Sequence, residues 1–198
     1  MAGRKKPRKR GRGRPRPGIL GRLKPEEARE VLLRLLEAHG ELRAEAAEIA
    51  TGLLAGASFE SIADGVEAAL LGLGLDDLAS RAGRHSRGYL SPTDAAWELL
   101  EESVEPFASD MRRLEELGLA EQGLETRKGV VLGLYRVRNG CGDGVLEWAE
   151  DFPSEAASRV LEARGDGRGR RGRGPRLPRD FVARHAPEWG WLADEDGG

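Results

Sequence analysis

The first 24 residues of this 198-residue chain contain eleven lysines and arginines and no acidic residue, and this segment most limits the fold that the chain can adopt. Apart from proline, it has no apolar side chain between Ala2 and Ile19. Such a segment cannot bury enough surface to offset the entropy lost on ordering. Residues 25–163 have the opposite sign, with 13 basic and 28 acidic residues and a net charge of −15. The sequence therefore predicts a disordered basic arm over residues 1–24 and an acidic domain over residues 25–164.

The composition of the acidic domain favours helices. Aromatic residues make up only 5% of the chain, so leucine, alanine and valine must form the core, which favours helix over sheet. Pro25 followed by two glutamates, and Ser91 followed by Pro92, are typical helix starts. We expect helices over residues 25–40, 41–55, 58–72, 75–82, 91–106, 107–117, 119–138, 145–152 and 153–163, with a loop over residues 83–90. Pro106 is expected to kink or end its helix, because proline lacks an N–H group.

Short helices joined by short loops place neighbouring helices antiparallel. The expected fold class is therefore all-α, either a helical bundle or a short stack of helix pairs. In the first helix, Val31, Leu32, Leu35 and Leu36 recur at helical spacing. Three aromatic residues in apolar helical patterns are expected to anchor the core, namely Trp97, Tyr135 and Trp148.

The composition changes again after the helical domain. Gly165 to Arg176 is rich in glycine and arginine, which predicts a linker over residues 165–180. Residues 181–198 form a short tail that carries Trp189 and Trp191. This tail either docks on the helical domain or inserts into a groove of a partner, and the sequence leaves both alternatives open.

The octet at residues 9–16 reads Lys-Arg-Gly-Arg-Gly-Arg-Pro-Arg. Its Arg-Gly-Arg-Pro core resembles the AT-hook of the high-mobility-group A chromatin proteins, and a related core without proline occurs in nucleoid silencers of actinobacteria. The resemblance covers eight of the 198 residues and implies an extended segment that binds the minor groove of AT-rich duplex DNA. The residues to which it assigns DNA binding are Lys9, Arg10, Arg12, Gly13, Arg14, Pro15 and Arg16.

The chemistry of these residues suits a narrow groove. Gly13 has no side chain, so the backbone can approach the floor of a groove that is only about 6 Å wide. Arg12 and Arg14 can extend along the groove, and narrow A-tract grooves attract arginine through their negative potential. Pro15 fixes its own φ and directs the chain back toward the phosphates. The flanking cations would contact phosphates and carry no sequence information.

A generic cationic tail is the alternative interpretation of the arm. Arginine greatly outnumbers lysine, which indicates a GC-rich genome, and such a genome readily generates tracts of glycine, arginine and proline. A tail of this kind would bind RNA or single strands through charge and guanidinium stacking. It could also pair with the acidic domain of its own chain and compete with DNA.

Residues for catalysis or metal binding are sparse. His39, His85 and His185 lie far apart in the sequence, and Cys141 stands in a glycine-rich turn without a nearby histidine. We therefore expect a non-enzymatic protein without a metal or cofactor. A pocket near Arg84, His85, Arg87 and Tyr89 is the remote enzymatic alternative. A single cysteine and the absence of an apolar run near 18 residues favour a cytoplasmic location.

Two functions follow from these observations. The first is a bacterial nucleoid-associated protein that uses its arm as a minor-groove hook and its helical domain for protein interaction. The second is a helical interaction scaffold whose tails bind RNA or other nucleic acids without specificity. Neither pattern identifies the protein partner of the helical domain.

Overall fold

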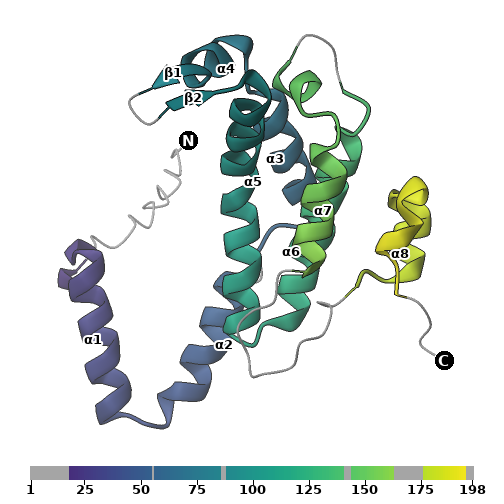
Figure 1. The fold of residues 1–198 in the computed structure, drawn as a ribbon. Coiled ribbons are helices and arrows are strands. Elements are labelled where there is room, and N and C mark those ends of the chain that lie inside the picture. Colours follow the sequence, from purple (N-terminus) through teal and green to yellow (C-terminus); the bar gives the residue numbers. More distant parts are fainter. Residues whose placement is uncertain (1–17, 55, 86–87, 141–143, 163–175, 195–198) are drawn as a thin grey trace, which may run out of the picture. The chain divides into compact units, whose positions relative to one another are not determined.

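The computed structural model describes residues 18–54, 56–85, 88–140, 144–162 and 176–194 (Figure 1). The chain divides into two compact units, residues 1–50 and residues 51–198. The first unit contains a 3₁₀ turn, η1 (Ile19–Arg22), then α1 (Pro25–Ala38) and most of α2 (Leu42–Leu54). No helix in the described part of the chain is both long and apolar enough to cross a membrane.

Helix α1 begins as its sequence predicts. Pro25 occupies its first turn, and the carboxylate of Glu27 accepts a hydrogen bond of 2.9 Å from the backbone N–H of Lys24. Glu26 and Glu27 also lie where the helix dipole favours negative charge. None of the described residues of α1 or α2 is buried, however. The apolar residues whose spacing predicted this helix do lie in a helix, but they are not buried.

The second unit is mostly helical, as the sequence predicts, with one small antiparallel sheet among its described residues. Its elements in chain order are α3 (Phe59–Leu71), α4 (Leu75–Arg81), β1 (Gly83–His85), β2 (Gly88–Leu90), α5 (Pro92–Glu116), α6 (Ala120–Arg136), η2 (Val145–Trp148), α7 (Phe152–Glu162), α8 (Arg179–His185) and η3 (Pro187–Leu192). The all-α fold class is thus confirmed for the described part of the chain.

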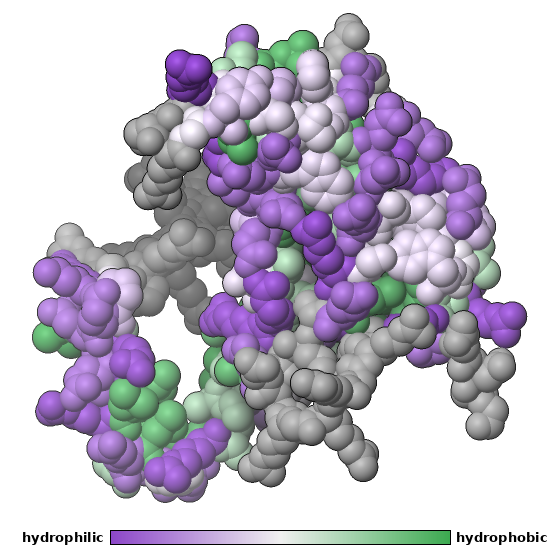
Figure 2. Space-filling view, in the orientation of Figure 1, coloured by the Kyte–Doolittle hydropathy of each residue, from purple (hydrophilic) through white to green (hydrophobic). Residues whose placement is uncertain are grey.

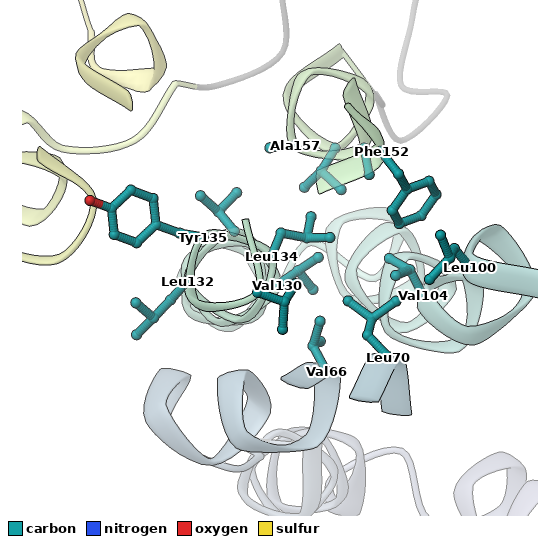
Figure 3. Close-up of a cluster of buried hydrophobic side chains, with 14 of the residues drawn as sticks. Val66, Leu70, Leu100, Val104, Val130, Leu132, Leu134, Tyr135, Phe152 and Ala157 are labelled. Atoms are coloured by element: carbon teal, nitrogen blue, oxygen red, sulfur yellow. The ribbon is translucent and has the colours of Figure 1, made fainter. Parts of the chain in front are cut away.

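Helix α6 lies at the centre of the second unit. It packs against α3, α5 and α7, and it contributes Val130, Val131 and Leu134 to the core with no exposed surface (Figure 3). Figure 3 shows side chains pointing from α6 in several directions, toward Val66 on α3 and Leu100 on α5. The residues of α6 from Gly129 to Tyr135 are all buried, so this part of the helix is covered on all sides. The core of this unit is therefore built around one helix.

The prediction of a loop over residues 83–90 is wrong for the residues of this range that the structure describes. Strands β1 and β2 pair there in antiparallel register, with Arg84 opposite Tyr89. Gly83 and Gly88 adopt φ values of 112° and 136°, a region that side chains with a Cβ atom rarely reach. These two glycines allow the short strands to form where the sequence lacks the alternation typical of a half-buried strand.

Of the two outcomes expected at Pro106, a kink or a helix end, the helix end is wrong, because α5 continues through this residue. Proline inside a helix costs about 3 kcal/mol or more through the lost hydrogen bond and the ring clash. The buried face of α5 continues on both sides of Pro106 with Leu100, Val104 and Met111. Burying each such side chain contributes about 1.5–3 kcal/mol, so the shared core outweighs the cost of the proline.

The C-terminal tail docks on its own unit. Phe181 and Trp189 are buried, and their rings lie edge-on to Phe59 at 5.3 Å and to Tyr135 at 5.2 Å between centroids. The bond from Leu177 N–H to the Leu192 carbonyl, 3.2 Å long, closes the tail on itself. Of the two sequence alternatives for this tail, docking on the body is the one that the structure adopts.

The three expected aromatic anchors behave differently. Tyr135 is buried, and Trp97 is partly buried with its ring edge-on to Phe152. Trp148 is 45% exposed, so its expected place in the core is wrong. In the short 3₁₀ turn η2, Val145 and Leu146 are the residues that are buried in the core instead.

Candidate nucleic-acid interface and the charged surface of the body

The octet at residues 9–16 lies outside the described residues, which begin at Gly18. Its predicted contacts with DNA therefore remain predictions that rest on the sequence. What the structure adds is the state of the charged side chains in the rest of the chain. These determine where else a polyanion could bind.

Among the described residues of the second unit, most cationic side chains are held by carboxylates of the same unit. Arg136 donates a hydrogen bond of 2.6 Å to Asp64 and contacts Glu67 at 3.1 Å, which joins α6 to α3. The other pairs are Arg81 with Glu98 and Glu102, Arg112 with Glu105, Arg127 with Glu115, Lys128 with Glu125, Arg138 with Glu188, and Arg159 with Glu101 and Glu155. A cation held by a carboxylate is a poor phosphate ligand, because the phosphate would have to displace an anion. These seven paired cations of the described structure are therefore poorly suited to bind a nucleic acid.

A groove of about 690 Å³ separates α5 from α7. Its floor is apolar, with Val104, Phe152 and Val160, and carboxylates stand along its edge, namely Glu101, Glu102 and Glu105. Each of these carboxylates is bound by an arginine, so the edge is largely neutralised. The lining includes Ser109 but no histidine or cysteine. The groove therefore suits an apolar side chain better than a catalytic reaction.

His185 and His39 have different local surroundings in the described structure. His185 stacks on the ring of Phe181 at 4.9 Å and lies edge-on to Phe59, which gives it a packing role. His39 follows the end of α1 and contacts Glu41 through its Nδ1 at 3.2 Å. Cys141 lies outside the described residues, and so does Arg87 of the remote enzymatic cluster, whose Arg84 and Tyr89 pair across the small sheet. No three histidine, cysteine, aspartate or glutamate side chains group as a metal site within the described ranges.

Arg81 joins α4 to α5 through a two-point contact with Glu102, at 2.8 Å and 2.7 Å. These hydrogen bonds lower the pKa of Glu102. A carboxyl whose pKa is lower in the folded than in the unfolded state adds stability above the ordinary pKa, and this stability is lost as the pH falls through the lowered pKa.

We therefore expect Glu102→Gln to be less stable than the wild type near neutral pH, and the difference to shrink in acid. Urea unfolding of both proteins, near neutral pH and in acid, measures this difference in the free energy of unfolding. The effect is small because the pair is exposed to solvent. Glu116→Gln is the matched control, since Glu116 is exposed near the end of the same helix. A difference that grows in acid would contradict the assigned role of the pair.

No protein-family model matches this sequence, and no curated protein or solved structure is significantly similar to it.

Proposed function

We propose that this protein binds nucleic acid through the octet at residues 9–16, with AT-rich duplex DNA as its preferred ligand, and that it acts as a non-enzymatic, nucleoid-associated protein. The observation that carries the proposal is the division of charge along the chain. Residues 1–24 hold eleven cations and no carboxylate, whereas residues 25–163 carry a net charge of −15 and most of the described cations of the second unit are in ion pairs. A polyanion is therefore attracted to the arm and repelled by the body.

In this function Arg12 and Arg14 enter the minor groove on either side of Gly13, and the remaining cations of the arm contact phosphates. The two groups of residues have different effects. Groove contacts distinguish AT-rich from GC-rich DNA through groove width and potential, whereas phosphate contacts add affinity for every sequence.

Replacing Arg12 and Arg14 together by alanine should remove the preference for AT-rich over GC-rich duplex, by about ten-fold or more in the ratio of the two dissociation constants. Fluorescence anisotropy with both duplexes at two salt concentrations measures this ratio. The matched control is Arg4→Ala with Arg8→Ala, which removes the same charge outside the hook core. The control should weaken binding to both duplexes equally and lower the dependence on salt. A preference that survives loss of Arg12 and Arg14 would refute the hook.

A helical scaffold with non-specific tails is the second candidate. The groove between α5 and α7 favours it, because its partly apolar lining could receive a partner's side chain. Competition separates the two functions. If random single-stranded RNA displaces the full chain from AT-rich duplex as well as the duplex itself does, the scaffold with non-specific tails is the better account.

A further inference from the structure

The first unit exposes an apolar surface that its own residues do not cover. Val31, Leu32, Leu33, Leu35 and Ile49 are 42–57% exposed, and Ile19 and Leu20 of η1 are 80% and 68% exposed. Figure 2 shows hydrophobic side chains open on the surface of α1 and α2. We call the residues Val31, Leu32, Leu35 and Ile49 the α1–α2 apolar surface. Monomeric proteins rarely expose a contiguous apolar patch of more than a few hundred Å².

Helices α1 and α2 need a partner to be stable. They have 14 and 13 residues, and isolated helices of this length are marginal in water. Helices in proteins obtain most of their stability from packing of an apolar face. No described residue of α1 or α2 is buried, so these two helices do not supply that contribution to each other.

The spacing of the apolar residues indicates the kind of partner. Ala28, Leu32 and Leu35 follow one another at intervals of four and three residues, and α2 repeats this spacing from Leu42 through Ile49. These are the intervals of helices that pack knobs into holes. Val31 and Leu36 flank the stripe in α1 and widen it to about 140° at 100° per residue. A stripe of this width exceeds the seam of a two-helix coiled coil and suits a bundle of four helices.

We infer that the α1–α2 apolar surface binds a second copy of this chain, so that two α1–α2 segments form a four-helix bundle. Two copies supply the four helices that the stripe requires, related by a two-fold axis. The exposed fractions of the seven residues named above add up to nearly four fully exposed aliphatic residues per chain. Covering this area on both copies comes within reach of the roughly 1,200 Å² that specific interfaces bury.

The charges of α1 permit this contact. Glu26, Glu30 and Glu37 lie on the face opposite the apolar stripe, and Arg34 pairs with Glu30 there at 2.7 Å. The centre of the α1 stripe would therefore be free of charge, with these three acidic residues pointing to solvent.

Sedimentation equilibrium of the full chain tests this inference. The wild type should approach 43 kDa, twice the mass of 21.5 kDa, at tens of micromolar. Leu32→Glu with Leu35→Glu should weaken association by about a hundred-fold or more, because both charges would be buried in the seam. The matched control is Ala44→Glu with Ala47→Glu, which adds the same charge at exposed positions of α2 away from its stripe and should leave the dimer intact.

A second, conservative variant is needed in case the two introduced glutamates unfold α1. Leu32→Ala with Leu35→Ala preserves helix propensity and should weaken association by about ten-fold or more. A wild type that stays monomeric at these concentrations would overturn the inference, and so would a dimer that both double variants leave unchanged. A wild-type monomer would instead mean that the surface is covered by its own chain or by a different protein.

Pairing would also bring two arms together, a consequence that rests on the proposed function. Arg16 and Pro25 are nine residues apart, so the chain between them spans at most about 30 Å. Two hooks joined in this way would bind duplex DNA bivalently. We expect the wild type to bind a duplex with two AT tracts at least ten-fold more tightly than Leu32→Glu with Leu35→Glu, and the two proteins to bind a single tract equally. If neither binds AT-rich DNA, the proposed function fails while the sedimentation result stands.

Discussion

Replacing Gly133 by valine should destabilise the second unit by about 3 kcal/mol or more, at the upper end of the usual cost of overpacking. A Cβ atom at Gly133 would lie 2.6 Å from the Cβ atom of Val66 and 2.9 Å from the backbone oxygen of Ala63. Side-chain rotation cannot relieve a contact with a backbone atom, so α3 and α6 would have to separate. Their separation would disturb the helix pair on which the core of this unit is built.

Urea unfolding followed by circular dichroism measures the effect. Gly129→Val should behave similarly, because a Cβ atom there would lie 2.5 Å from the Cβ atom of Ile62 and 2.7 Å from the Phe59 oxygen. Gly52→Ala is the matched control, since this helical glycine has no neighbour within 4 Å. The control should be neutral or gain up to about 1 kcal/mol from helix propensity. If Gly133→Val unfolded at the wild-type urea concentration, α3 and α6 could not be as closely packed as the structure has them.

Helix positions could be predicted from the sequence because their signals are local. Pro25 and Ser91 mark helix starts, and apolar spacing identifies the helices between the breaks. The helix end predicted at Pro106 was wrong because the energetic cost of the proline is outweighed by packing of α5 against the core. The local sequence around Pro106 does not show that packing. The central place of α6 was missed for the same reason, although glycines four residues apart, at positions 129 and 133, were a signal of close helix approach.

The candidate sites differ in how much of them the sequence contains. The hook is a contiguous motif, so all its residues are visible in the sequence, and the structure does not describe them. The groove between α5 and α7 joins residues some fifty positions apart, such as Val104 and Phe152, and no spacing rule identifies such a pair. Apolar spacing also predicted α1, but it did not indicate what covers the apolar face of this helix. The same stripe could pack in the core of its own chain, against a second copy of the chain or against a different protein.

Arg127 is a buried residue that the sequence pattern did not identify, and a mutation of its partner should show its contribution to stability. Its guanidinium is fully buried and pairs with Glu115, whose side chain is 17% exposed. Replacing Glu115 by alanine removes a buried carboxylate while the arginine keeps its charge. Breaking a buried ion pair from one side costs about 3–5 kcal/mol. We expect a loss of this size for Glu115→Ala in urea unfolding.

The control for this variant is Glu116→Ala, which removes the same charge from the next, exposed position of α5 and should change the stability by less than about 0.5 kcal/mol. The double variant Arg127→Met with Glu115→Leu removes both charges and keeps apolar volume, so it should recover most of the loss. Arg127 lies on the apolar stripe of α6, three residues after Leu124 and four residues before Val131. Recovery in the double variant would show that this position tolerates an apolar side chain as its helical spacing suggests, and that the cost of Glu115→Ala comes from the buried charge. If the double variant were as unstable as Glu115→Ala, the ion pair itself would be required to join α5 to α6.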